Sequence, residues 1–125
     1  MARFTKSQRL LTSRDFDQVL DGSGTKVLCS DFVLIASARH PRRPSRLGLI
    51  VSSKVGNAVV RNRVKRSIRA VFREGLLDDP ALAERDIVVI ARPSLVSKEG
   101  RVKDKIQDIL LNCSQRLSSK LKSAP

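Results

Sequence analysis

The side chains that could take part in chemistry in this sequence are mostly basic, and many of them lie in one stretch. The 125 residues include 25 Lys and Arg against 12 Asp and Glu, which gives a net charge of +13. Between Phe32 and Arg73 there is no acidic residue, whereas eleven basic residues occur. Because a solvated surface normally mixes both signs of charge, this segregation indicates a polyanionic partner.

Four basic residues of this stretch recur at every fourth position of a predicted helix. Like charges at this spacing destabilise an isolated helix by roughly 0.2–0.5 kcal/mol per pair, and no acidic residue precedes Glu74 on the helix. An ordinary solvated helix face would be expected to carry acids as well. We therefore expect these residues to face phosphates, which the forked guanidinium of Arg binds well. The four residues are Arg61, Lys65, Arg69 and Arg73.

Groups for acid–base or metal catalysis are sparse. Hydrolysis of a phosphodiester by a protein usually needs clustered carboxylates or a pair of histidines. His40 is the single histidine, Asp15 and Asp17 fall on different faces of a short helix, and residues 78–79 form an acidic pair without further ligands. The sequence therefore predicts no catalytic residue, no metal site and no protein-bound cofactor.

The two cysteines and the first residues of the chain indicate the cellular compartment in which the protein is expected. Cys29 and Cys113 fit no CxxC spacing, and a zinc site or a Cys–His nucleophile lacks the other residues that it needs. The first residues are basic, but no apolar run of a secretory signal follows, and no run approaches the roughly 18–20 residues that span a bilayer. We expect a cytoplasmic protein whose cysteines are reduced and buried as small hydrophobic residues.

Hydrophobic periodicity and turn residues predict seven elements in the order α-β-β-β-α-β-α. Asn57 is a good N-cap for the central helix, and the apolar run 87–90 suits a central buried strand. The predicted helices are 14–21, 58 to about 74, and 102–117. The predicted strands are 27–29, 32–36, 47–52 and 86–91.

These elements predict a single α+β domain, a two-layer sandwich of helices on a small sheet. The central helix would pack on the sheet through an apolar stripe, and its basic residues would lie on an adjoining arc. The domain is predicted to span 12–117, between a basic lead-in at 1–11 and a flexible tail at 118–125. The stripe consists of Val60, Val64, Ile68, Val71 and Phe72.

The segment at 54–69 reads KVGNAVVRNRVKRSIR. In its strand-to-helix context this sixteen-residue run resembles the signature of the bacterial ribonuclease P protein family. The resemblance extends upstream to 47–52, downstream to 86–92, and to Arg9 and Phe16 near the start, so that it covers roughly 9–113 in one collinear order. It implies an αβββαβα fold with a left-handed βαβ crossover, against the general rule.

The resemblance also implies a function. The chain would be the protein subunit of ribonuclease P, an endoribonuclease whose catalyst is an RNA, and would not be catalytic alone. Its partners would be the catalytic ribonuclease P RNA and precursor tRNA, from which the RNA removes the 5′ leader, with Mg²⁺ at the RNA active site. No membrane and no obligate protein partner are expected.

The resemblance places two sets of binding residues on this sequence. The central helix would meet the RNA subunit, and a cleft between the first helix and the sheet would hold the leader. For the RNA subunit we predict Lys54, Asn57, Arg61, Asn62, Arg63, Lys65, Arg66, Arg69 and Arg73. For the leader we predict Arg9, Arg14, Phe16, Leu20, Val33, Ile35 and Ser52.

The chain departs from the family pattern at two places. Members often have aromatic residues at the positions of Leu20 and Ile35, so that Phe16 with aliphatic neighbours forms the stacking surface here. Many members have paired lysines where this chain has Ser53 and Lys54. Both changes bear on the strength of leader binding.

Three other classes of protein were weighed. Composition alone would also suit a ribosomal or assembly RNA-binding protein, against which the 54–69 run argues. A helix-turn-helix DNA regulator would need a second short helix just before the basic one, where 47–52 is typical of a strand. A stand-alone nuclease lacks catalytic ligands.

Overall fold

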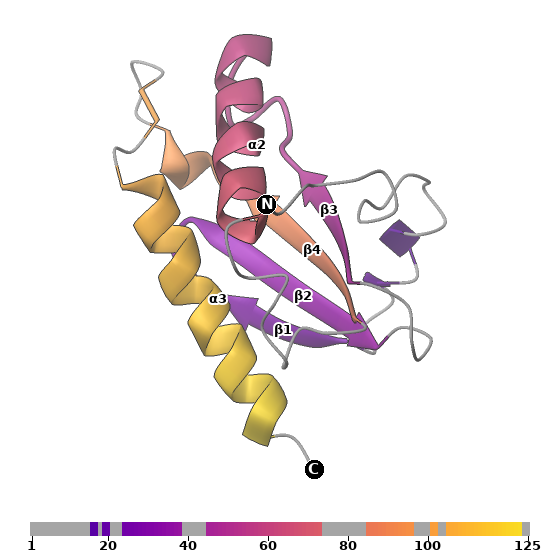
Figure 1. Cartoon of the computed structure of the whole chain (residues 1–125). Coiled ribbons are helices and arrows are strands. Elements are labelled where there is room, and N and C mark those ends of the chain that lie inside the picture. Colours follow the sequence, from indigo (N-terminus) through magenta and orange to yellow (C-terminus); the bar gives the residue numbers. More distant parts are fainter. Residues whose placement is uncertain are drawn as a thin grey trace.

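The computed structural model contains a four-stranded sheet with two long helices against one side of it (Figure 1). It describes residues 16–17, 19–20, 24–38, 45–73, 85–96, 101–102 and 105–123. Phe16, Asp17 and Val19 are helical, at the place of the predicted first helix. The elements are β1 Thr25–Leu28, β2 Phe32–Ala38, β3 Arg46–Ile50, α2 Ala58–Arg73, β4 Arg85–Ala91, a 3-10 helix Pro93–Leu95 and α3 Ile106–Ser123.

The strands lie in the order β1-β2-β4-β3. β2 pairs antiparallel with both β1 and β4, whereas β3 pairs parallel with β4. β4 is therefore central, as its apolar run predicts, and Ile87, Val88 and Val89 are fully buried. With the helices toward the viewer, the chain passes from β3 through α2 to β4 on the left of β3 (Figure 1), so the crossover is left-handed.

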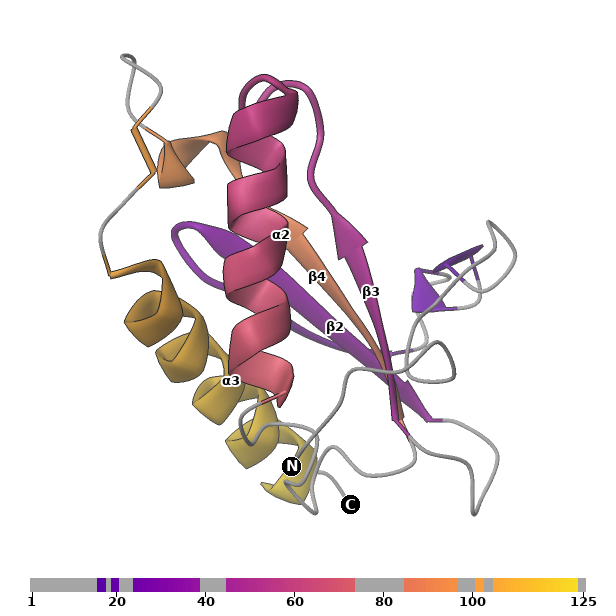
Figure 2. The same cartoon turned by 45° about the horizontal axis from the view of Figure 1, so that its top comes forward.

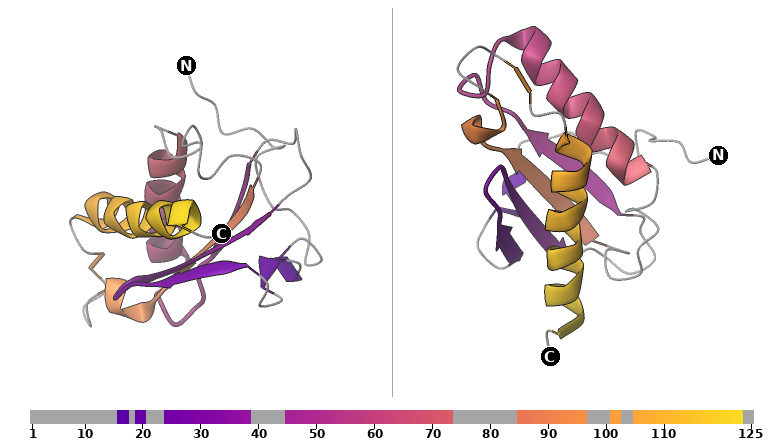
Figure 3. Two further views of the ribbon diagram at one scale, coloured as in Figure 1. Left: turned by 90° about the horizontal axis from the view of Figure 1, so that it is seen from below. Right: turned by 90° about the vertical axis from the view of Figure 1, so that its left-hand side faces the viewer.

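The two faces of the sheet have different partners, since successive side chains of a strand point to opposite faces. One face carries residues such as Leu34, Leu47 and Ile87, which pack with α2 and α3 in the main core. Seen edge on, both helices lie on this side of the sheet (Figure 3, left panel). α3 contacts β1, β2 and α2, and Figure 2 shows α2 passing in front of the strands with α3 beside it. The α+β two-layer architecture is thus confirmed.

The opposite side, which we call the open face, has a smaller apolar cluster. Its sheet residues are packed by Phe16 and Val19 of the first helical segment, and Val19 is fully buried. A leader cleft between this segment and the sheet would therefore lie on the side away from α2 and α3. The open-face residues of the sheet are Val33, Ile35, Ile50, Val88 and Ile90.

The last helix differs from its prediction at both ends. Val102 precedes α3 and forms a bridge with Val96, so the helix begins later, at Ile106. It continues through Ser123, and Ser118 and Leu121 are buried. The expectation of a flexible tail from Ser118 is therefore wrong for 118–123, because apolar residues at helical spacing keep this segment on the core.

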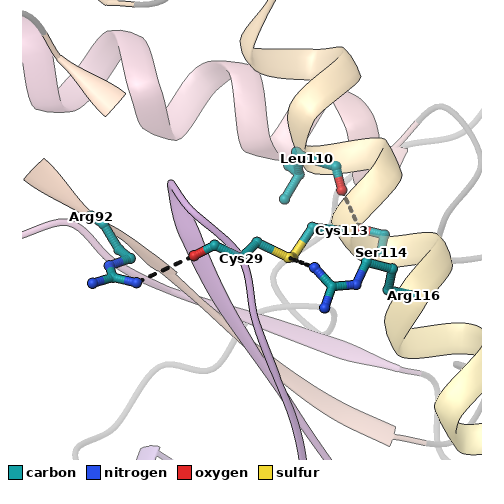
Figure 4. Close-up of a disulfide and its surroundings, with 6 residues drawn as sticks. All are labelled: Cys29, Arg92, Leu110, Cys113, Ser114 and Arg116. Carbon is teal, nitrogen blue, oxygen red and sulfur yellow. Dashed lines mark hydrogen bonds between the residues drawn. A yellow bond between two sulfur atoms is a disulfide. The ribbon is translucent and has the colours of Figure 1, made fainter. Parts of the chain in front are cut away.

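The cysteines also differ from their prediction, since Cys29 and Cys113 form a disulfide (Figure 4). They are 84 positions apart in sequence, but the turn after β1 meets the middle of α3, with a Cα–Cα distance of 6.3 Å. This distance lies within the usual range for disulfides. The expectation of two reduced thiols was wrong. It rested on the reducing cytoplasm and on the wide sequence spacing, and neither reveals that the fold brings the two residues into contact.

Candidate nucleic-acid interface

α2 begins where the sequence predicts, because Asn57 caps it. The Asn57 side-chain oxygen accepts a hydrogen bond of 3.0 Å from the backbone N–H of Val60, which satisfies one of the free donors of the first turn. Gly56 lies just before the cap, and a Cβ there would come within 2.8 Å of a Val60 methyl group. The close approach of the chain to Val60 thus favours glycine, and together these residues fix the start of the helix.

The apolar stripe of α2 packs as predicted. Val64, Ile68, Val71 and Phe72 are buried, and Val60 is half-buried at the first turn. This packing fixes the rotation of α2 about its axis. The rotation in turn decides which basic side chains reach solvent.

The basic residues of α2 fall into two groups by exposure. Arg61, Lys65 and Arg69 are half-buried, since they flank the apolar stripe. The other predicted residues on the helix and just before it are exposed. The exposed set is Lys54, Asn57, Asn62, Arg63, Arg66 and Arg73. We call both groups together the α2 basic surface.

Arg61 stands out in this surface. Its Nε is buried, and it has no hydrogen-bond partner within the described residues. A buried donor without a partner costs free energy, so the guanidinium would gain an acceptor only if its side chain turned outward. No acidic residue lies in the first turn of α2, where the helix dipole also favours an anion.

The open face brings together three of the seven residues predicted for the leader, namely Phe16, Val33 and Ile35, and two more, Leu20 and Ser52, lie next to elements of this face. Phe16 and Val33 are half-buried against the apolar cluster of Ile35. Leu20, at 39% exposure, follows the same helical segment as Phe16. Ser52 is exposed just beyond the end of β3. Arg9 and Arg14 lie outside the described residues.

The strand register arranges the open face in rows. Val33 on β2 is opposite Ile90 on β4, and Ile90 is opposite Ile50 on β3. Val33, Ile50 and Ile90 are only partly buried. The row therefore presents apolar surface against which a flat group can pack beside Phe16.

An ion pair at one end of the open face was not anticipated from the sequence. Arg46 donates two hydrogen bonds to the Asp86 carboxylate, of 2.8 Å from Nε and 2.6 Å from a terminal nitrogen. The two residues are opposite one another in the parallel β3–β4 pair. The pair balances the charge of Asp86, which would otherwise repel a polyanion from this face.

The described residues contain no group of three or more His, Cys, Asp or Glu side chains that could hold a metal ion. His40, Asp15 and residues 78–79 lie outside that part of the chain.

Among the described helices, none is long and apolar enough to cross a bilayer. The arrangement offers two surfaces for nucleic acid, a cationic helix and an apolar sheet face.

Comparison with known proteins decides the family. The sequence model of the family described as Ribonuclease P matches residues 4–114. The chain belongs to the ribonuclease P protein family. The curated ribonuclease P protein component of Stutzerimonas stutzeri is 43% identical over 98 residues, which cover 78% of this chain and 72% of the relative. The one from Brevibacillus brevis is 36% identical over 120 residues, or 96% and 90% of the two chains.

Solved structures of ribonuclease P proteins share the fold. The Staphylococcus aureus protein superposes with a TM-score of 0.72 at 31% identity, covering 89% of this chain and 95% of that one. The Thermotoga maritima protein gives a TM-score of 0.72 at 34% identity, covering 86% and 96%. The family resemblance is thus confirmed, and with it the expectation of an RNA-binding subunit that acts with the catalytic RNA in precursor-tRNA processing.

Proposed function

We propose that this ribonuclease P protein binds its two RNA partners through separate surfaces on opposite sides of the sheet. The α2 basic surface binds the catalytic RNA, and the open face binds the 5′ leader of precursor tRNA. The observation that carries the proposal is this division: cationic side chains collect on α2, while partly exposed apolar residues collect around Phe16 on the other side.

The α2 basic surface suits a structured RNA through its phosphates. Arg63, Arg66 and Arg73 are exposed and reach outward, whereas Arg61 holds a buried donor without a partner in the described residues. Arg binds phosphate oxygens with a planar fork of donors, and Asn62 adds an amide that can donate to phosphate or read a base edge. Affinity from such contacts would be largely electrostatic and sensitive to salt.

The open face suits a single strand. Bases of an unpaired strand have no partner for their flat faces, and an aromatic side chain can stack on them. Phe16 supplies the ring, with Leu20, Val33 and Ile35 as aliphatic neighbours. The Ser52 hydroxyl can donate a hydrogen bond to the phosphate backbone of the leader. We also assign Arg9 and Arg14 to this site as phosphate contacts.

The chemistry of leader removal belongs, in this proposal, to the RNA. Mg²⁺ would be held at the RNA active site, and the protein would raise affinity for the precursor and reduce repulsion between the two RNAs. We place the complex in the cytoplasm.

The test uses two variants, each of which should impair one of the two binding activities and leave the other unchanged. Arg63→Gln with Arg66→Gln should weaken binding to the catalytic RNA and leave the preference for a leader intact. Phe16→Ala should leave binding to the catalytic RNA intact and reduce that preference. If both variants lose the same binding activity by the same factor, the two surfaces do not bind different RNAs as proposed.

A further inference from the structure

A groove runs between β1 and α3, at the edge of the sheet farthest from β3. Its volume is about 950 Å³. α3 lies along β1 on this side of the molecule (Figure 1). The residues that line it are Lys26, Val27, Leu28, Asn112, Gln115, Arg116, Ser119 and Lys120. We call it the β1–α3 groove.

The lining of the β1–α3 groove is cationic. Lys26, Arg116 and Lys120 contribute positive charge, and none of the eight lining residues is acidic. Lys120 Nζ donates to the backbone oxygen of Lys26 at 2.8 Å, and Arg116 contacts the sulfur of Cys29 at 3.4 Å (Figure 4). The amides of Asn112 and Gln115 and the hydroxyl of Ser119 add neutral hydrogen-bonding groups.

The groove is continuous with the open face. Lys26 is opposite Ile35 in the β1–β2 register, and Leu28 is opposite Val33. Because opposed residues point to the same side of a sheet, Lys26 and Leu28 extend two rows of the open face to its β1 edge. Leu28 is 60% exposed, which is unusual for a leucine of a strand and leaves an apolar surface at the point where the face ends.

We propose that the 5′ leader, after crossing the open face, passes over β1 and lays its more distal nucleotides in the β1–α3 groove. This inference rests on the proposed function, because it needs the proximal leader on the open face. Lys26, Arg116 and Lys120 contact the phosphates, and a base packs on Leu28. The neutral lining groups contact sugar and phosphate, so binding in the groove is tolerant of sequence.

Two other occupants fit less well. A peptide strand that extended the sheet at β1 would need the backbone oxygen of Lys26, and Lys120 of α3 already donates to this acceptor. The catalytic RNA would be held at α2, and no residue of α2 is among those that line the groove. The groove therefore has charge for an RNA strand and a position that a leader can reach.

The experiment uses the reconstituted holoenzyme and precursor tRNAs whose leaders are lengthened one nucleotide at a time. The groove variant is Lys26→Gln with Lys120→Gln. The matched control is Arg101→Gln with Lys105→Gln, which removes the same charge at exposed positions outside the groove, the open face and α2. Dissociation constants are measured for every leader length with the wild type and both variants.

For short leaders, the groove variant should bind as tightly as the wild type. Beyond a threshold length, its affinity should be lower than that of the wild type for the same leader, by roughly three- to tenfold for two lost phosphate contacts. The control should show no threshold. An equal loss at every length would overturn the inference and assign the groove to the catalytic RNA, and no loss at any length would overturn it as well.

Phe16→Ala separates a failure of this inference from a failure of the proposed function. If Phe16→Ala weakens the binding of short leaders while the groove variant shows no threshold, the leader uses the open face but not the groove. If Phe16→Ala has no effect at any length, the open face itself does not hold the leader.

Discussion

Arg46 and Asp86 face one another across the parallel strands β3 and β4 and form a bidentate ion pair on the open face. The side chains are only 17% and 8% exposed. A carboxylate at this depth depends on its partner, since removing one member of a buried pair leaves an uncompensated charge. The pair therefore links the edge strand β3 to the interior strand β4.

Arg46→Ala should lower the free energy of unfolding by roughly 2–4 kcal/mol, because Asp86 loses its two-pronged partner. Arg46→Lys should retain only part of the stability, since an ammonium cannot form two parallel bonds. Denaturant unfolding followed by circular dichroism measures both changes. Adding Asp86→Asn to Arg46→Ala should restore part of the loss. A single Arg46→Ala variant as stable as the wild type would mean that the pair is incidental.

Arg63→Gln with Arg66→Gln should weaken binding to the catalytic RNA and flatten its salt dependence. Each phosphate contact contributes about 0.7–0.9 to the slope of log affinity against log salt, so two lost contacts should reduce the slope by about 1.4–1.8. Both side chains are exposed, and the fold should be unaffected. The matched control is the groove pair Lys26→Gln and Lys120→Gln, for which the slope should stay at the wild-type value. An unchanged slope for the α2 pair would exclude these arginines as phosphate contacts.

Phe16→Ala separates a stacking residue from a core residue. Loss of a stacked aromatic should weaken leader binding by about 1–3 kcal/mol, or roughly 5- to 160-fold, whereas loss of a core Phe would cost about 3–5 kcal/mol of stability. Because Phe16 is only half-buried, we expect near-normal melting and weaker binding of precursor tRNA, with mature tRNA little affected.

Val19→Ala is the control for Phe16→Ala, since Val19 follows on the same helical segment and is 1% exposed. It should lower stability by about 1.5–3 kcal/mol with little specific effect on the leader. If Phe16→Ala melts as early as Val19→Ala, or weakens binding of both tRNAs equally, Phe16 belongs to the core.

Reduction of the Cys29–Cys113 disulfide should lower the free energy of unfolding by about 2–4 kcal/mol, because the bond closes a long loop in the unfolded chain. Thermal melting with and without dithiothreitol measures this difference, and thiol titration should find no free thiol in denatured, unreduced protein. The Cys29→Ser, Cys113→Ala double variant should melt at one temperature in both conditions. Two titratable thiols in protein kept without reductant would contradict the pairing.

Local features of this fold could be predicted from the sequence. Asn57 and the stripe that includes Val64 and Ile68 place the start and the rotation of α2, because capping and helical period act within a few residues. The family resemblance likewise assigned Val33 and Ile35 to one cleft, and both residues lie on the open face.

Long-range features could not be predicted in this way. The Cys29–Cys113 bond spans 84 positions and the Arg46–Asp86 pair spans 40, and both depend on how whole elements pack. The apolar spacing also predicted that the last helix begins at Val102. In the structure Val102 instead forms a β-bridge with Val96, and the helix begins at Ile106. The groove beside Leu28 follows from the packing of α3 along β1, for which the sequence of either element alone has no signal.

The central claim is that this chain supplies binding surfaces and no catalytic groups, and cleavage of precursor tRNA tests it most directly. Purified protein free of RNA, the catalytic RNA alone and the reconstituted complex are assayed across a range of Mg²⁺ concentrations. We expect no cleavage by the protein, and cleavage by the complex at lower Mg²⁺ than the RNA alone requires. Magnesium-dependent cleavage by the RNA-free protein, undiminished by ribonuclease treatment and further purification, would contradict it.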